Sequence, residues 1–258
     1  GSVRGIQVFV RVEFLLILLT ISLALFHTFS EAAGATAEET GFPLLWHMLS
    51  TGTALCFGIS LLSHEFGHAT VARHYGIRTP SVTFFLFGGV LAIEDPVPSP
   101  KAEFLIAIAG PLVSAVISAV FAFISVCGVG LFTSDVTDHM DAIWIATRWL
   151  SKINLSMACF NMLPLFPMDG GRVVRAGLWW LHGDMLRATR FASWAARCIA
   201  ICIMGCGAAI IWGVEIPFLP TSIFGGVWLI LMAGLLERTA RAEYRWTELR
   251  LLGLTQTP

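Results

Sequence analysis

Residues 52–73 of the chain read GTALCFGISLLSHEFGHATVAR, an apolar run interrupted by His64, Glu65 and His68. The run is long enough to cross a bilayer as a helix, since a span needs about 20 mainly apolar residues. Ionisable side chains inside a membrane helix are costly, so by default they mark a functional site. The stretch therefore predicts a membrane helix that carries functional groups.

The composition of the whole chain is also typical of a membrane protein. Hydrophobic residues make up 56% of the 258 residues and charged residues 13%, against roughly 25% charged residues in soluble domains. The mean hydropathy is +0.78, which means more apolar surface than a soluble fold of this length could bury. The net charge of −1 gives no sign of a nucleic-acid partner. We expect the lipid bilayer to surround the chain.

Six apolar segments reach or approach the length of a span, and we expect an all-α polytopic membrane protein. They are residues about 8–27, 44–73, 103–127, 142–163, 191–212 and 218–236. At the start of the first segment, Ile6, Val8 and Val10 alternate with other residues. That period of two is typical of a strand, so a helix starting near residue 13 is the alternative.

Residues 82–93 read VTFFLFGGVLAI and differ from the helical segments. They are rich in β-branched and aromatic residues, a Gly-Gly pair interrupts them, and prolines flank them. We expect two short re-entrant strands within residues 76–94, near the cytoplasmic edge of the membrane. Such backbone is tolerated at membrane depth only where protein or a wet cavity covers it.

The distribution of charge predicts the orientation. With six helices, both termini share a side of the membrane with the loops after the second and fourth helices. Only Arg148 and Lys152, two of the 16 basic residues, fall elsewhere. Because loops with an excess of Lys and Arg are cytoplasmic, we expect both termini in the cytoplasm.

Residues 64–68 form an H-E-x-x-H motif. On a helix, residues i and i+4 lie one turn apart on the same face, so His64 and His68 can bind one metal ion, which the motif predicts to be zinc. Glu65 can take a proton from a metal-bound water, whose pKa zinc lowers to about 7. A hydrogen-bonded cluster of core side chains is the alternative.

A catalytic zinc usually has three protein ligands and one open position. The best-placed candidate for the third ligand is Asp169, in the segment NMLPLFPMDGGR at residues 161–172. Pro164 and Pro167 break the helix there, and Gly170-Gly171 permits tight backbone. On the residues alone, a surface turn at a helix end explains this segment equally well.

The two motifs together resemble the site-2 protease family of intramembrane zinc metalloproteases. The segment at residues 161–172 is similar to the family's N-x-x-P-x-P-x-D-G pattern with one extra residue of spacing, at Asn161, Pro164, Pro167, Asp169 and Gly170. Two further stretches also resemble family signatures, namely Gly88-Gly89 and Ala109-Gly110-Pro111.

The resemblance implies a role for each motif residue. His64, His68 and Asp169 would bind one zinc ion, and Glu65 would be the catalytic base. Asn161 would help to bind substrate or to stabilise a tetrahedral intermediate, since an amide can donate to a developing oxyanion. An interhelical hydrogen bond is the alternative role for Asn161.

The resemblance also implies an activity. We expect a zinc-dependent endopeptidase that hydrolyses peptide bonds within or near the transmembrane segments of membrane proteins. Residues 82–93 would hold the substrate extended by β-augmentation. The alternative is a non-catalytic zinc-binding scaffold or pseudoprotease. A zinc transporter would show acidic and histidine residues on several helices, whereas here they gather at one point.

The order of the segments resembles the simpler branch of the family, in which no PDZ domain is inserted. We expect a protease domain over residues 1–236 and a cytoplasmic tail over residues 237–258 that forms a short surface helix, with a partner-binding helix as the alternative. The cystathionine-synthase-like regulatory domain of many members is not expected after the tail. The expected location is the plasma membrane of a bacterium or archaeon, with multiple spans.

The six cysteines lie in or beside apolar stretches and form no C-x-x-C pair, so they do not indicate a disulfide framework. Cys198, Cys202 and Cys206 share one helical face. We interpret them as small packing residues, with a metal or redox role as the alternative.

Overall fold

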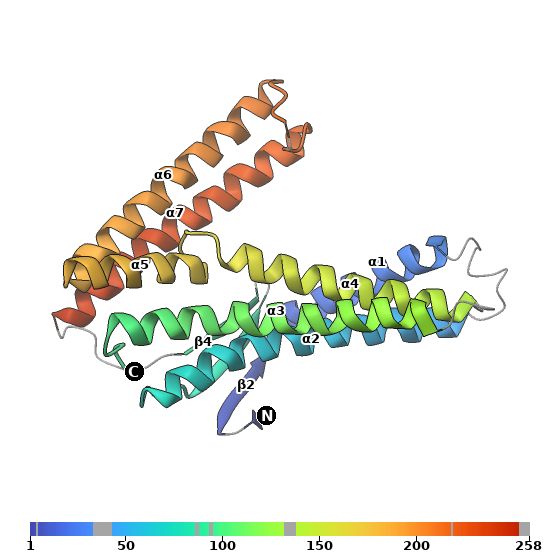
Figure 1. Cartoon of the computed structure of the whole chain (residues 1–258). Coiled ribbons are helices and arrows are strands. Elements are labelled where there is room, and N and C mark those ends of the chain that lie inside the picture. The colour runs from blue at the N-terminus through green and yellow to red at the C-terminus, as the bar shows by residue number, and fades with distance from the viewer. Residues whose placement is uncertain are drawn as a thin grey trace. The chain divides into compact units, whose positions relative to one another are not determined.

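The structure is a computed structural model that describes residues 1–3, 5–32, 43–85, 88–92, 95–131, 138–217 and 219–252. Parts of the predicted strand region, residues 86, 87, 93 and 94, and the last six residues of the tail lie outside the described residues. The elements, shown in Figure 1, are β1 (Ser2–Val3), β2 (Ile6–Val10), α1 (Val12–Ala32), α2 (Pro43–His74), β3 (Ser81–Phe85), β4 (Gly88–Leu91), α3 (Pro100–Leu131), α4 (Asp138–Asn161), α5 (Asp169–His182), α6 (Met185–Ile211) and α7 (Ile223–Leu251).

The chain divides into two compact units. The first consists of Gly1–Asp95 and Ala109–Cys159, and the second of Pro96–Ile108 and Phe160–Pro258. Helix α3 therefore contributes its first turns to the second unit and its remainder to the first. That residues 1–236 act as one protease domain stays a prediction.

Four of the described helices are long and apolar enough to cross a membrane. These spans are Val12–Glu31, Pro100–Cys127, Met185–Ile211 and Ile223–Leu251. The predicted spans 44–73 and 142–163 also form long helices, α2 and α4, but they are not among these four. The mostly helical fold with a small sheet is confirmed, whereas six transmembrane helices are not.

The prediction of a first helix that starts at about residue 8 is wrong, and the alternative of a strand followed by a helix from about residue 13 is confirmed, because Ile6–Val10 is strand β2 and α1 begins at Val12. The strand forms because it pairs in parallel with β3, which itself pairs antiparallel with β4. The order in the sheet is β1-β2-β3-β4. The two predicted strands are present as β3 and β4, and the start of the chain extends their hairpin into a four-stranded sheet.

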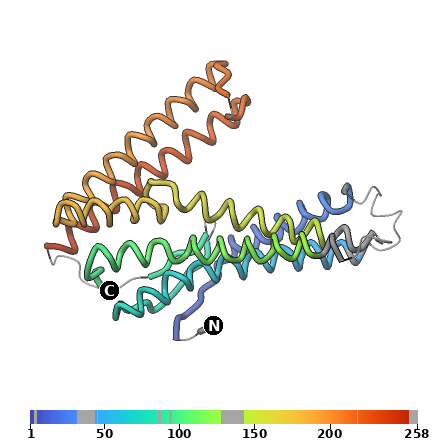
Figure 2. The backbone as a smooth tube through the Cα atoms, viewed as in Figure 1, coloured from blue at the N-terminus to red at the C-terminus, as the bar shows by residue number. Residues whose placement is uncertain are grey.

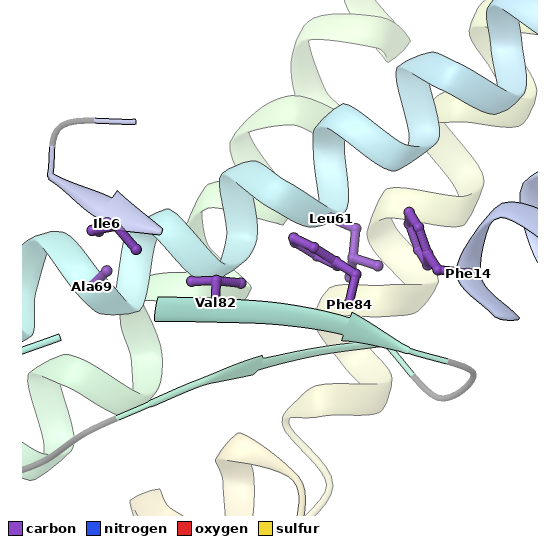
Figure 3. Close-up of a cluster of buried hydrophobic side chains, with 6 residues drawn as sticks. All are labelled: Ile6, Phe14, Leu61, Ala69, Val82 and Phe84. Atoms are coloured by element: carbon purple, nitrogen blue, oxygen red, sulfur yellow. The ribbon is translucent and has the colours of Figure 1, made fainter. Parts of the chain in front are cut away.

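One face of the sheet packs on helices α1 and α2. Figure 3 shows the buried side chains of this cluster, which are Ile6, Phe14, Leu61, Ala69, Val82 and Phe84. The rings of Phe14 and Phe84 lie 5.2 Å apart. Alternate residues of β3 point into the cluster, as the period of two requires. The sheet is therefore held against the same helix that carries the H-E-x-x-H motif.

Polar side chains join the helices of the first unit. Asn154 of α4 is fully buried and donates from Nδ2 to the Ser60 Oγ of α2 at 3.3 Å. Ser118 of α3 donates to the Ser151 carbonyl oxygen of α4 at 2.8 Å. Where no water is available, hydrogen bonds between helices replace the hydrogen bonds that these polar groups would make with water. These contacts therefore hold α2, α3 and α4 together.

The second unit differs from the predicted boundaries in two places. Helix α5 was not predicted, and α7 continues to Leu251, so the prediction of a helix end near Leu236 is wrong. Residues 235–252 contain neither glycine nor proline, which leaves nothing to stop the helix. Gly183, at φ +70°, ends α5, and the Asp184 side chain then caps α6 by accepting from the Leu186 and Arg187 amides.

Helices α6 and α7 run side by side as a hairpin, which Figure 2 shows in orange and red. Glycines permit their close approach. A Cβ built on Gly207 would lie 2.7 Å from the Gly226 carbonyl oxygen, and the reverse distance is also 2.7 Å. Small residues at such crossings are typical of membrane helices.

A buried arginine joins three helices of the second unit. The Arg175 side chain of α5 is 6% exposed and pairs with Glu103 of α3, which is 0% exposed, and with Glu243 of α7. Burial alone would lower the pKa of Arg175, but the two carboxylates outweigh it and raise that pKa. Arg175 also lies over the Phe166 ring, 5.4 Å from its centroid. The charge cluster therefore fixes α5 between α3 and α7.

We predict that Arg175→Met destabilises the protein by about 3–5 kcal/mol, because it leaves the buried Glu103 carboxylate without its counter-charge. Unfolding of the purified protein in detergent measures this loss. The matched control is Arg187→Gln, since Arg187 is exposed and pairs with Asp184 on the surface. Equal unfolding midpoints for the two variants would show that the buried pair does not stabilise the unit.

Candidate metal centre

Helix α2 brings His64, Glu65 and His68 onto its buried side. The three side chains belong to residues that are 3%, 8% and 4% exposed, respectively. The spacing of four residues puts the two imidazoles one turn apart on the same face. The structure therefore brings together the three predicted residues of the H-E-x-x-H motif.

The two imidazoles face each other edge-on. Their Nε2 atoms lie 3.2 Å apart, and their ring planes are inclined at 78°. Two nitrogens bound to one tetrahedral zinc, each about 2.0–2.1 Å from it, lie roughly 3.3 Å apart. An N–H···N hydrogen bond between the rings has a similar length. The separation therefore fits a zinc site, and zinc content distinguishes the two interpretations.

A serine orients the first imidazole. The Nδ1 atom of His64 lies 2.8 Å from the Ser114 Oγ of α3, and Ser114 is fully buried. A hydrogen bond at Nδ1 leaves Nε2 free to point toward His68. Metal-binding histidines almost always have such a partner at the second ring nitrogen, so this contact supports a metal-binding role for His64.

Two glycines allow the helix backbones to approach each other at the histidines. A Cβ on Gly110 of α3 would lie 2.2 Å from the His68 Nε2 and 2.7 Å from the His64 Nε2. A Cβ on Gly67 of α2 would lie 2.9 Å from the Ala109 carbonyl oxygen. Gly110 therefore leaves the space that the two Nε2 atoms occupy, and Gly67 lets α2 approach the backbone of α3.

Strand β4 passes beside the candidate catalytic base. A Cβ on Gly89 would lie 2.6 Å from Glu65 Cγ and 2.7 Å from Glu65 Oε1. The backbone at Gly89 is therefore in close contact with the Glu65 carboxylate. This contact places β4, the edge strand of the sheet, next to Glu65, the predicted catalytic base.

Asp169 and Asn161 belong to the second unit. Helix α4 ends at Asn161, and residues 162–168 are not helical, as the two prolines predict. Asp169 is the first residue of α5 and is 9% exposed. The convergence of Asp169 and Asn161 on the histidine pair stays a prediction.

The two residues after Asp169 must be glycines for steric reasons. A Cβ on Gly170 would lie 2.3 Å from the Met162 and Leu163 carbonyl oxygens, and one on Gly171 would lie 2.7 Å from the Leu165 carbonyl carbon. The turn after α4 therefore folds back onto the first residues of α5. Only glycine fits this close approach, which confirms the predicted tight backbone at Gly170-Gly171.

Sequence reasoning missed Ser114 and the steric roles of Gly67 and Gly110. Ser114 follows Gly110 by four residues, so the two share a face of α3. That spacing was a usable signal once α3 was taken to face the histidines. The contact of Gly89 with Glu65 could not be found this way, because it joins residues of a strand and a helix.

Comparisons with known proteins find a matching family and similar proteins. The model of the family described as "Peptidase family M50" matches residues 52–147 and 129–205. The protein Rip3 of Mycobacterium tuberculosis is 38% identical over 217 residues, which are 84% of this chain and 52% of Rip3. This chain thus spans about half the length of that relative.

Two further similar proteins come from Methanocaldococcus jannaschii. Zinc metalloprotease MJ0392 is 34% identical over 146 residues, which cover 57% of this chain and 40% of that protein. The solved structure of a site-2 protease from the same organism is 26% identical with a TM-score of 0.55, and the match covers 95% of this chain and 93% of that one.

We predict that Gly110→Ala abolishes zinc binding, because the added methyl group would occupy the space between the two imidazoles. Elemental analysis of the purified protein measures the zinc content. Gly52→Ala in α2 is the matched control, since a Cβ at Gly52 meets nothing within 4 Å. Full zinc content in Gly110→Ala would mean that the imidazoles do not bind the metal in this arrangement.

Proposed function

Because the chain belongs to peptidase family M50, we propose that it is a zinc-dependent endopeptidase that hydrolyses peptide bonds within or near the transmembrane segments of other membrane proteins. The proposal rests above all on the histidine pair, whose Nε2 atoms lie 3.2 Å apart in a space that Gly110 leaves open. The adjacent Glu65 adds the acid–base group that hydrolysis requires.

Asp169 is proposed as the third zinc ligand. A catalytic zinc commonly has two histidines and a carboxylate as its protein ligands. Asp169 stands at the start of a helix whose backbone is fixed by two glycines and by the Arg175 ion pairs. A carboxylate on such a rigid segment loses little entropy when it binds a metal. Asn161, at the end of α4, is proposed to donate to the substrate oxyanion.

Zinc bound by these residues would supply a water whose pKa is near 7 and would polarise the scissile carbonyl. The chain's own groups then handle the protons. Glu65 accepts a proton from the attacking water and donates it to the leaving amine, so that it acts first as a base and then as an acid. Ser114 keeps the His64 ring in one orientation throughout.

The edge strand β4 is proposed to bind the substrate in extended form. A helical substrate hides its peptide bonds in its own hydrogen bonds, and an open strand edge offers replacement partners. The Ala92 amide donates to the Ser81 carbonyl oxygen of β3, so the Leu91 amide, one residue earlier, points to the open edge. That edge continues to Gly89, which lies against Glu65.

The proposed setting is a plasma membrane, with both termini on the cytoplasmic side. The distribution of the basic residues supports this orientation. The substrates are then transmembrane proteins that reach the centre laterally through the lipid. A zinc-binding scaffold without activity is the second candidate function, but every motif position is filled by its usual residue.

We predict that Glu65→Gln retains zinc and loses cleavage of a membrane-spanning test substrate by at least about 10²-fold, the lower range for a lost acid–base group. Asp169→Asn should lose most of the zinc as well as the cleavage. Elemental analysis and a gel-based cleavage assay measure the two quantities. Cleavage by Glu65→Gln at the wild-type rate would contradict the proposed function, and full zinc in Asp169→Asn would contradict the third ligand.

We predict that Leu91→Pro reduces cleavage about tenfold or more and leaves the zinc content unchanged. Proline removes the Leu91 amide, which with the Gly89 amide points to the open edge, but proline is tolerated in edge strands. The control Leu91→Val keeps the amide and an apolar side chain. If both variants cleave equally well, the substrate does not pair with β4.

A further inference from the structure

Helix α7 has one exposed apolar face in its first half. Phe224, Trp228, Leu231 and Leu235 are 87%, 58%, 60% and 42% exposed. Their spacing of four, three and four residues places them on the same side of the helix. Because α7 is one of the four candidate spans, this face is suited to contact with lipid hydrocarbon.

The same face becomes basic in the second half of the helix. The spacing continues through Arg238, Ala242, Arg245 and Leu249, with Arg241 and Trp246 beside them. These six residues, here called the arginine stripe, line a hollow of about 400 Å³. The lipid-facing side of α7 thus leads directly into a cationic hollow that also contains aromatic and aliphatic groups.

The arginines of the stripe differ in their pairing. Arg241 pairs with Glu237, which also accepts from Arg197 of α6 at 3.0 Å. Arg238 and Arg245 form no ion pair or side-chain hydrogen bond with the part of the chain that the structure describes. Both are exposed. Two positive charges are therefore available to an external anion, two helical turns apart.

The position along α7 indicates where that anion lies. Residues 223–236 carry no charge, and Glu237 is the first charged residue of the helix. Arginine stems extend along apolar surface while their charged ends stay in water, and tryptophan is enriched at the membrane interface. Arg238, Arg245 and Trp246 therefore fall at the depth of the lipid headgroups.

We propose that the arginine stripe binds the headgroup of an anionic phospholipid, with the phosphate between Arg238 and Arg245. From the phosphate, the glycerol and acyl chains extend toward the hydrocarbon along the exposed face of Leu235 and Leu231, while Trp246 contacts the headgroup on the water side. A soluble phosphate would use the arginines but not the apolar groups, so the mixed chemistry favours a lipid. This site is separate from the metal centre and does not depend on it.

The test compares lipid retained by the purified protein. Wild type and variants are reconstituted in nanodiscs with equal amounts of phosphatidylglycerol and phosphatidylcholine, extracted again in detergent, and their bound lipids counted by mass spectrometry. Wild type should be enriched in phosphatidylglycerol. The double variant Arg238→Gln/Arg245→Gln should lose this enrichment on the order of tenfold, as expected for two arginines at a membrane surface.

The matched control is Arg78→Gln/Arg187→Gln, which removes the same charge from two exposed arginines that are paired with Asp95 and Asp184. It should retain the wild-type enrichment, and all three proteins should unfold at similar temperatures. Equal loss in both double variants would overturn the proposal, since it would mean that only the net charge matters. Displacement of the lipid by inorganic phosphate would also overturn it, because the site would then recognise a free anion.

Discussion

Two imidazoles and a carboxylate buried in an apolar helix need polar partners, because a membrane provides no water to replace them. The packing around α2 is arranged to meet this requirement. Helix α3 contributes Ser114 to one imidazole and omits a side chain at Gly110, while β4 brings its backbone to Glu65 at Gly89. The sheet is in turn held on α2 by the apolar cluster at Phe14, Val82 and Phe84. Helix α3 and the sheet thus enclose the three side chains, and α3 supplies a hydrogen-bond partner to His64.

The second unit also contains buried polar groups, and there oppositely charged side chains pair with each other. Arg175 and Glu103 are both buried, and each would be strongly unfavourable alone. Together with Glu243 they connect α5 to α3 and α7. Such pairs add little net stability compared with apolar residues, but they link α5 to two other helices. These links suit a helix whose first residue, Asp169, must have a defined position for the proposed metal site.

Much of this could be predicted from the sequence, because the decisive signals were local. The motif at His64–His68 and the helix break at Pro164 and Pro167 follow from spacing and backbone chemistry alone. The elements that were misjudged depend on distant partners. The period of two at residues 6–10 indicated a strand, but its pairing with β3 could not be read from the sequence, and α5 is held by Arg175 contacts with residues about 70 positions away. The role of Ser114 likewise required knowing which helix faces α2.

The parallel pairing of β2 with β3 has a practical consequence for handling the protein. Strand β2 covers the side of β3 that faces away from β4, and β1 pairs with the outer side of β2. A truncation that begins after Val10 would uncover a row of unpaired amides and carbonyls on β3. Open strand edges recruit other chains and promote aggregation. Shortened versions of the protein should therefore keep the first ten residues, and fusion partners are better joined through a flexible linker ahead of them.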